Sequence, residues 1–143
     1  MQASLTAGGT TSVSVNFMFK TRSIYPHPLN LDNAQCIAVA RGPFIYCAET
    51  VDNAHISDLR AIRIPDGAEF LEESLDTQGL EAIGFDRDGV SGIGGKAIIL
   101  RTKAHIIRTK ENVGDADVTL TLVPYFMWAN RGKSNHRVWL PRA

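Results

Sequence analysis

Acidic side chains are the first residues in this sequence that could do chemistry. Glu72, Glu73 and Asp76 offer the two carboxyl groups that a glycosidase needs, but such a pair must flank a cleft at a fixed separation. Adjacent glutamates point to opposite sides of a strand, or lie about 100° apart on a helix, so a solvated face is the favoured interpretation. Residues 86–89, DRDG, begin like a calcium-binding loop, but no closing glutamate follows, which favours a turn.

Glycines and histidines raise two further possibilities. The stretch GVSGIGGKA, residues 89–97, fails as a phosphate loop because Val90 replaces the first glycine and Ala97 replaces the magnesium-binding Ser or Thr. A turn between strands is favoured instead. The histidines do not have the spacing of metal ligands, and the sequence has no Ser or Cys on a nucleophile elbow that could complete a catalytic triad. Each histidine is therefore interpreted as a surface or hydrogen-bonded imidazole. They are His27, His55, His105 and His136. The sequence therefore indicates no catalytic site of its own.

The chain has only two cysteines, Cys36 and Cys47. Two thiols are too few for a structural zinc site or a disulfide-dense scaffold, and they leave the compartment undetermined. A two-residue hairpin around Arg41-Gly42 would place the two sulfur atoms opposite each other. Pro43 lacks the amide that closes such a turn, so a bulge or bend competes with the hairpin and is favoured over a disulfide.

A run near the C-terminus, VTLTLVPYFMWANR, concentrates aromatic side chains. In an extended strand over residues 118–128, one face would carry an unbroken apolar series that is typical of core. That face holds Val118, Leu120, Leu122, Pro124, Phe126 and Trp128. The other face turns from threonine to apolar side chains halfway along, so we expect a loop or a neighbouring domain to cover its later half. Exposed Trp and Tyr rings bind sugars in some proteins, but the parity of Trp128 favours a structural role.

Composition limits the class of protein. A chain of 143 residues with 44% hydrophobic residues can fill one core, which predicts a single domain over residues 1–143. Fifteen basic and fifteen acidic residues cancel, so neither nucleic acid nor an anionic membrane is expected as a partner. No apolar run approaches the roughly 18 residues that span a bilayer, and the first residues carry no basic-then-apolar signal.

Hydrophobic periodicity predicts mostly strands. The clearest is SVSVNFMF, residues 12–19, in which Val13, Val15, Phe17 and Phe19 share one side. Further strands are expected at residues 36–40, 44–49, 61–64, 97–103, 118–128 and 136–140. Residues 53–59 and 68–74 have room for a helical turn or two. The expected fold is therefore all-β, an antiparallel, jelly-roll-like β-sandwich with at most short helical turns.

Three segments carry a resemblance to a known family: YPHP (residues 25–28), AVARGPFIYCAE (38–49), and VPYFMWANRG with RVWLP (123–132 and 137–141). They resemble, in the same order, the region downstream of the catalytic barrel in the beta-L-arabinofuranosidases of glycoside hydrolase family 127. The pair Asp52-Asn53 also resembles the family, because it follows the Arg-Gly-Pro strand in the same order. The resemblance spans nearly the whole chain and is weakest between about Pro65 and Lys110.

The family implies an (α/α)6 barrel with a zinc-bound cysteine nucleophile and a glutamate acid, followed by β-sandwich domains that pack against the barrel. This chain has no helical barrel, and its two cysteines do not match the zinc-binding positions. No catalytic or metal residue is therefore carried over, and zinc is implied only for the absent barrel. The resemblance predicts a noncatalytic accessory domain whose partner is the barrel. The alternative is an autonomous carbohydrate-binding module.

Candidate contacts to the barrel or to a glycan follow from the same segments. Interfaces favour Trp, Tyr and Arg, so we select Arg41, Tyr46, Trp128, Asn130 and Arg131. For Asn130-Arg131-Gly132 the alternative is a tight turn, in which Asn and Gly tolerate positive φ and Arg points to water.

Overall fold

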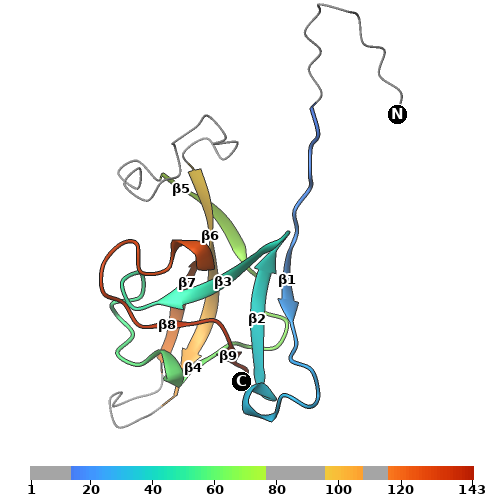
Figure 1. Ribbon diagram of the computed structural model, residues 1–143. Helices are drawn as coiled ribbons and strands as arrows, with labels where there is room; N and C mark the ends of the chain where they lie inside the picture. Colours follow the sequence, from blue (N-terminus) through green and yellow to red (C-terminus); the bar gives the residue numbers. More distant parts are fainter. Residues whose placement is uncertain (1–13, 77–95, 108–115) are drawn as a thin grey trace, which may run out of the picture.

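A computed structural model describes residues 14–76, 96–107 and 116–143, and in these residues the chain is antiparallel β structure with short 3-10 turns (Figure 1). The strands are β1 (Thr21–Ile24), β2 (Cys36–Arg41), β3 (Phe44–Glu49), β4 (Ile62–Arg63), β5 (Leu71–Asp76), β6 (Lys96–Ile106), β7 (Ala116–Pro124), β8 (His136–Arg137) and β9 (Leu140–Pro141). The 3-10 turns are η1 (Leu31–Asn33), η2 (Leu59–Ala61) and η4 (Tyr125–Met127).

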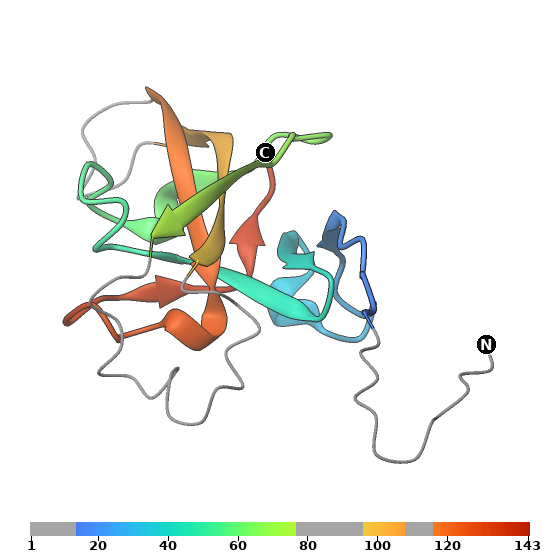
Figure 2. The same ribbon diagram turned by 90° about the horizontal axis from the view of Figure 1, so that it is seen from above.

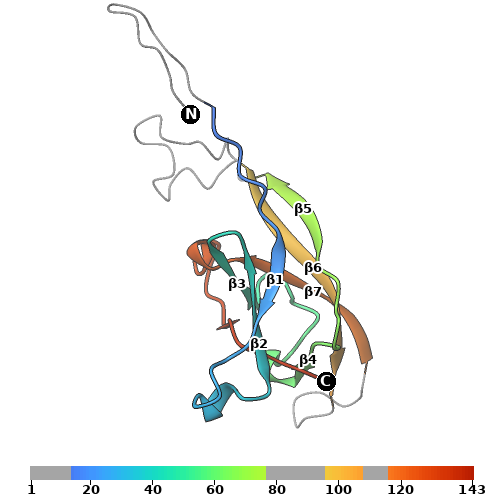
Figure 3. The same cartoon turned by 90° about the vertical axis from the view of Figure 1, so that its right-hand side faces the viewer.

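All nine of these strands join in one sheet that curls over its own core. The order is β1-β2-β3-β7-β6-β4, with β5 beside β6, β8 beside β3 and β9 beside β2. Figure 2 shows β3 linking the β1–β2 region to the remaining strands, and Figure 3 shows the β5–β6–β7 part of the sheet facing the β1–β2–β3 part. The all-β prediction is confirmed. Two separate sandwich layers are not confirmed, because the strand pairing is continuous.

The core lies inside this curl and follows the alternation of the strands. Tyr46 and Ala48 of β3 and Leu120 and Leu122 of β7 belong to the main buried cluster. Cys47, between the first two, belongs to a smaller cluster on the other face of the sheet, together with Ile99 and Val123. Both faces of β3 and of the second half of β7 are therefore covered.

Several predicted strands are confirmed with small changes of length. β2 and β3 cover the predicted residues 36–40 and 44–49, and β6 extends the predicted 97–103 in both directions. The predicted strand at 61–64 shortens to β4, and the one at 136–140 divides into β8 and β9, which pair with different strands. The turn predicted at residues 86–89, and most of the glycine-rich stretch 89–97, lie outside the described residues.

The prediction of a strand at residues 12–19 is wrong for the residues that the structure describes. Residues 14–19 are extended and make no backbone hydrogen bond to another described residue, and the first strand, β1, begins only at Thr21. Val15 and Phe17 are each 68% exposed, although the alternation predicted that they face a core. Alternation requires a neighbouring strand to become a sheet, and the described part of the chain supplies none here.

The prediction of a helical turn at residues 68–74 is also wrong. Leu71–Asp76 form β5, which pairs residue by residue with β6, so tertiary pairing overrides local preference. Glu72 and Glu73 therefore point to opposite sides of a strand. This is the first of the two arrangements that the sequence allowed for adjacent glutamates. Residues 53–59 form turns, and η2 follows them with Asp58 as its cap, accepting from the Arg60 amide at 2.9 Å.

β2 and β3 form a hairpin, so the competing bulge or bend in a continuing strand is wrong, and the hairpin differs by one residue from the register considered for a disulfide. Arg41 pairs with Phe44, so the loop is Gly42-Pro43 instead of Arg41-Gly42. The one-residue shift removes the direct opposition of Cys36 and Cys47. Both cysteines are free and buried, and no disulfide joins them. Burial raises the pKa of the Cys47 thiol to about 12, so this sulfur is held as an unreactive thiol.

Gly42 is required at the turn for two reasons, and alanine should show both. Its φ is +55°, and an added Cβ would lie 2.5 Å from Cδ1 of Phe19. Gly67 is a matched control, because its φ is +72° but no atom lies within 4 Å of the added Cβ. Both substitutions should lower the free energy of unfolding by about 1 kcal/mol, because alanine disfavours the left-handed backbone. Gly42→Ala should lower it by about 1 kcal/mol more, because its Cβ would clash with Phe19. Urea unfolding measures the difference, and equal costs would contradict the Phe19 contact.

Candidate functional site

A buried ion cluster joins the end of β3 to the segment after η4. The guanidinium of Arg131 contacts the carboxylate of Glu49 and both oxygens of Asp52, with Nη2 lying 2.7 Å from Asp52 Oδ2. Glu49 is 1% exposed, which is exceptional for a charged residue. The two carboxylates raise the pKa of Arg131, although burial acts in the opposite direction. The cluster is therefore held as a paired set of charges.

Asn53 extends this cluster into the backbone of β7. Its Nδ2 donates to the carbonyls of Glu49 at 2.8 Å and Thr121 at 2.9 Å, and its Oδ1 accepts from the Thr121 amide at 2.8 Å. The residue is fully buried, so these bonds satisfy main-chain groups that water cannot reach. Asn53 thus ties the turn after β3 to the middle of β7.

The segment after η4 turns sharply over this cluster. Ala129 has a φ of 62°, which is unusual for a residue with a side chain, and its amide donates to Glu49 Oε1 at 3.0 Å. Asn130 is exposed and donates to the Phe126 carbonyl at 3.2 Å, and Gly132 has a positive φ. The tight-turn interpretation therefore fits Gly132, but the residue with a side chain that adopts positive φ is Ala129 and not Asn130. It does not fit Arg131, which points inward to its two carboxylates.

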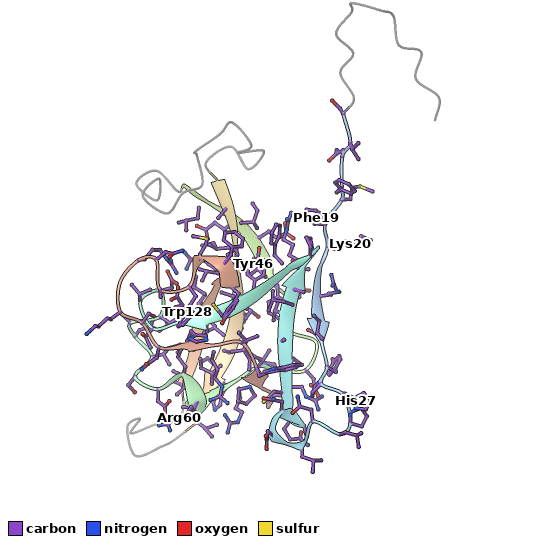
Figure 4. The ribbon with its side chains drawn as sticks, in the orientation of Figure 1. Phe19, Lys20, His27, Tyr46, Arg60 and Trp128 are labelled. Carbon is purple, nitrogen blue, oxygen red and sulfur yellow. The ribbon has the colours of Figure 1, made fainter. Side chains whose placement is uncertain are left out.

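The turn presents an aromatic patch, which we define as Tyr125, Trp128 and His136; Figure 4 labels Trp128. Tyr125 and Trp128 have ring centroids 6.0 Å apart and planes within 6°, and the His136 ring lies 4.2 Å from that of Trp128. Tyr125 is 43% exposed, Phe126 39% and Trp128 38%. Large apolar rings gathered at one place on the surface are typical of an interaction site.

The prediction that Trp128 lies in the core is wrong. β7 ends at Pro124, and η4 rotates the chain so that the two-residue alternation no longer applies. Met127 is buried instead, at 3% exposure, while Phe126 and Trp128 turn outward. The proline has no amide to continue the strand, which is the local reason for the break.

Two further candidate contact residues, Tyr46 and Arg41, lie apart from the patch. Tyr46 is 2% exposed and donates from its hydroxyl to the Ile98 carbonyl at 2.8 Å, so its ring is not available to a partner. Figure 4 shows it inside the sheet. Burial raises the pKa of Tyr46 to about 12. Arg41 forms an ion pair with Glu72 at 2.9 Å and lies over the ring of Phe19.

The Arg41–Glu72 pair predicts a pH-dependent contribution to stability. The hydrogen bond from Arg41, aided by one from the Thr21 hydroxyl, lowers the pKa of Glu72. A carboxyl group whose pKa is lowered by folding stabilises the protein at pH values above its unfolded pKa of about 4.3. This contribution is lost as the pH falls through the pKa of the folded state. Glu72→Gln should therefore cost under about 1 kcal/mol at pH 7, because the pair is partly exposed, and nothing at the lowest pH that preserves the fold. Urea unfolding at several pH values measures this, and a pH-independent cost would contradict it.

Histidines outside the patch bear out their interpretation as surface or hydrogen-bonded imidazoles. His105 contacts Asp117 at 3.1 Å, His55 contacts the Thr119 carbonyl at 3.1 Å, and His27 accepts from the Leu29 amide at 3.2 Å. Figure 4 places His27 far from Trp128. Within residues 14–76, 96–107 and 116–143, no group of three or more potential ligands could hold a metal ion.

A small pocket lies between Tyr25, Asp66 and Arg142. Its volume of about 70 Å³ is well below the roughly 300 Å³ at which ligand sites begin, so it does not compete with the patch as a binding site. In the described part of the chain, no helix has the length and apolarity needed to cross a bilayer.

Sequence reasoning missed the carboxylates that hold Arg131. Glu49 ends the apolar strand FIYCAE, and an acid that follows three buried positions of a strand is itself a signal that a cation must meet it. Asp52 was noted only as part of the resemblance. His136 was assigned no role, because its place beside Trp128 depends on β8 pairing with β3.

Comparisons with known proteins agree with this architecture. The sequence profile described as "Glycoside hydrolase family 127 C-terminal domain" matches residues 21–141. A non-reducing end beta-L-arabinofuranosidase of Bifidobacterium longum subsp. longum is 29% identical over 136 residues, which is 95% of this chain and 20% of that protein.

Two solved structures share the fold. A family 127 beta-L-arabinofuranosidase from Geobacillus stearothermophilus has a TM-score of 0.66 at 22% identity, covering 89% of this chain and 19% of that one. A beta-arabinofuranosidase of the same family has a TM-score of 0.66 at 26% identity, covering 89% of this chain and 18% of that one. The chain thus spans about a fifth of the length of these relatives.

Proposed function

This chain belongs to the glycoside hydrolase family 127 C-terminal domain family, and from that membership we propose that it is a noncatalytic accessory domain of a beta-L-arabinofuranosidase-like enzyme. Its role is to pack against the catalytic part of the enzyme and stabilise it. The aromatic patch is the surface that makes this contact. The single observation that carries the proposal is the exposure of the stacked rings of Tyr125 and Trp128 on one turn, in a chain that spans about a fifth of its relatives.

The chemistry of the patch suits a protein partner. Interface cores favour Trp, Tyr and Phe, and the residues with the largest contributions lie at the centre of such surfaces. A partner gains most when the rings are already held in place, because little side-chain freedom is then lost on binding. Here the turn that carries the rings is fastened by the Arg131 cluster and by the bond from the Ala129 amide to Glu49. The ion cluster therefore acts by positioning the patch.

Catalysis is assigned to polypeptide other than this chain. The described residues hold no nucleophile paired with a base, and the buried Cys47 thiol is held protonated. We expect the 143-residue chain to show no turnover of an aryl arabinofuranoside. Hydrolysis by the pure chain would contradict the assignment of a noncatalytic role.

A chimera tests the docking. The chain replaces the matched fifth of the Bifidobacterium enzyme, and the two parts should then unfold together. Trp128→Ala should cost the chain alone less than the roughly 3–5 kcal/mol of a buried Trp, because the ring is partly exposed. In the chimera it should weaken the coupling by about 2 kcal/mol or more. Differential scanning calorimetry of the chain and the chimera measures both effects.

Tyr25→Ala is the matched control, because Tyr25 is a 61% exposed aromatic residue outside the patch. It should leave the coupling unchanged. Independent unfolding of the two parts, or equal effects of the two substitutions on the coupling, would contradict docking through the patch.

Carbohydrate binding is the second candidate function, and the outward-facing, parallel rings of Tyr125 and Trp128 favour it. It predicts chemical-shift changes at these rings when arabinose-containing oligosaccharides are added to the chain, and their loss in Trp128→Ala. If shifts respond to the sugar in the chain alone while the chimera unfolds in two independent steps, this function replaces the first.

A further inference from the structure

The segment before β1, residues 14–20, has the form of a β-strand without a neighbouring strand among the described residues. Its side chains alternate as in a strand, and Val15, Phe17 and Met18 are 68%, 68% and 90% exposed. Within the described part of the chain, no backbone hydrogen bond reaches residues 14–19. The first such bond runs from the Gly42 amide to the Lys20 carbonyl at 3.4 Å. Figures 1 and 3 show the segment projecting beyond the sheet.

The base of this segment is held in a defined direction. The Phe19 ring stacks on Phe17 at 6.0 Å, meets the edge of Phe44 at 6.4 Å and lies beneath the guanidinium of Arg41 at 5.8 Å. It also fills the space that only a glycine at position 42 leaves open. A flexible linker needs no such anchor. The segment therefore leaves the domain as a straight continuation of β1.

The comparisons divide the chain at the same point. The C-terminal domain profile begins at Thr21, the first residue of β1. The match to the Bifidobacterium enzyme covers 95% of this chain, so it takes in residues 14–20 as well. Residues 14–20 are thus shared with a full-length relative but lie outside the domain that the profile describes.

We propose that residues 14–20 are a strand of a second β-sheet, formed by the polypeptide that precedes this domain in the enzyme. Residues 14–24 then make one continuous strand that belongs to two sheets, with β2 as its neighbour at one end. This inference rests on the proposed function, because it requires the preceding polypeptide. Strand addition satisfies the free backbone groups of residues 14–19 and covers the exposed rings.

The strand pairing has a directional signature. The Lys20 carbonyl points toward β2, and successive residues of a strand direct their amides to alternate edges. The amides of Asn16 and Val15 therefore point to opposite edges. A neighbouring strand on one edge needs only one of these amides, so proline should be tolerated at one position and not at the other.

Hydrogen exchange with mass spectrometry on the chain and on the chimera tests the proposal. In the chain alone, residues 14–20 should exchange freely; in the chimera their exchange should slow by at least ~10-fold. Of Val15→Pro and Asn16→Pro, one should abolish this protection, while Val15→Ala and Asn16→Ala should retain it.

Other outcomes overturn the proposal. Free exchange of residues 14–20 in the chimera excludes the second sheet, and so do two harmless prolines. Protection in the chain alone assigns the pairing to residues 1–13 or, if sedimentation shows a dimer, to a second copy. Hydrogen exchange at residues 125–131 measures docking through the patch independently of residues 14–20. Protection at residues 125–131 without protection at residues 14–20 would contradict the second sheet but still support the proposed function.

Discussion

Arg131→Met is expected to lower the free energy of unfolding of the chain by about 3–5 kcal/mol, because it leaves Glu49 buried without a cation. The substituted side chain keeps most of the volume, so the loss reports charge and hydrogen bonding more than packing. The Ala129 turn loses its second fastening at the same time, and the aromatic patch should lose its fixed geometry. Urea unfolding measures the stability, and near-ultraviolet circular dichroism reports the environment of Tyr125 and Trp128.

Arg101→Met is the matched control for this prediction. Arg101 also pairs with a glutamate, Glu73, but the two side chains are 44% and 53% exposed. An exposed pair contributes about 0.2–1 kcal/mol, so the control should differ little from the parent chain. The double substitution Arg131→Met with Glu49→Gln should recover part of the loss, because no buried charge is then left unpaired. Equal effects of Arg131→Met and Arg101→Met would show that burial does not strengthen the cluster.

Asn53→Ala is expected to cost about 3 kcal/mol or more. The substitution leaves the Thr121 amide and the carbonyls of Glu49 and Thr121 without their partner in a place that water does not reach. Each buried group left unsatisfied costs about 1–3 kcal/mol. It should also loosen β3 from β7. Urea unfolding measures the cost, and hydrogen exchange of the amide of Thr121 shows whether the loss is local.

Two further variants separate the causes of this effect. Asn53→Leu keeps the volume of the side chain but removes all three hydrogen bonds, so a large cost here shows that the lost hydrogen bonds, and not a cavity, cause the effect. Asn33→Ala is the control, because Asn33 is only partly buried and its side chain makes a single bond, to Asn30 at 3.2 Å. A cost under about 1 kcal/mol for Asn53→Ala would mean that water replaces the lost partners.

The resemblance identified the right segments before their contacts were known. Residues 38–49 and the pair Asp52-Asn53 are far in sequence from residues 123–132. The structure brings them together through the ion pairs of Arg131 with Glu49 and Asp52. Nothing in their separate sequences specified that Arg131 turns inward while Trp128 turns outward. That outcome follows from the end of β7 at Pro124 and the turn after it.

The order of residues by itself determined the elements whose evidence is local. Short runs rich in β-forming side chains defined β2, β3 and β6, and alternation defined the first part of β7. Prolines and glycines defined their ends, because these signals act within a few residues. Balanced charge and the single-domain length also followed from the residues alone.

Only the tertiary structure decided which alternation became a sheet. Residues 12–19 carry the clearest pattern, yet residues 14–19 pair with no strand in the described part of the chain. Leu71–Asp76 became a strand against a helical expectation. The pairing of Glu49 with Arg131 joins residues 82 positions apart. A strand gains its stability from the backbone groups and side chains of a neighbour, and a buried charge from a partner elsewhere in the chain. Both depend on which distant residues share a surface, and no local pattern contains that information.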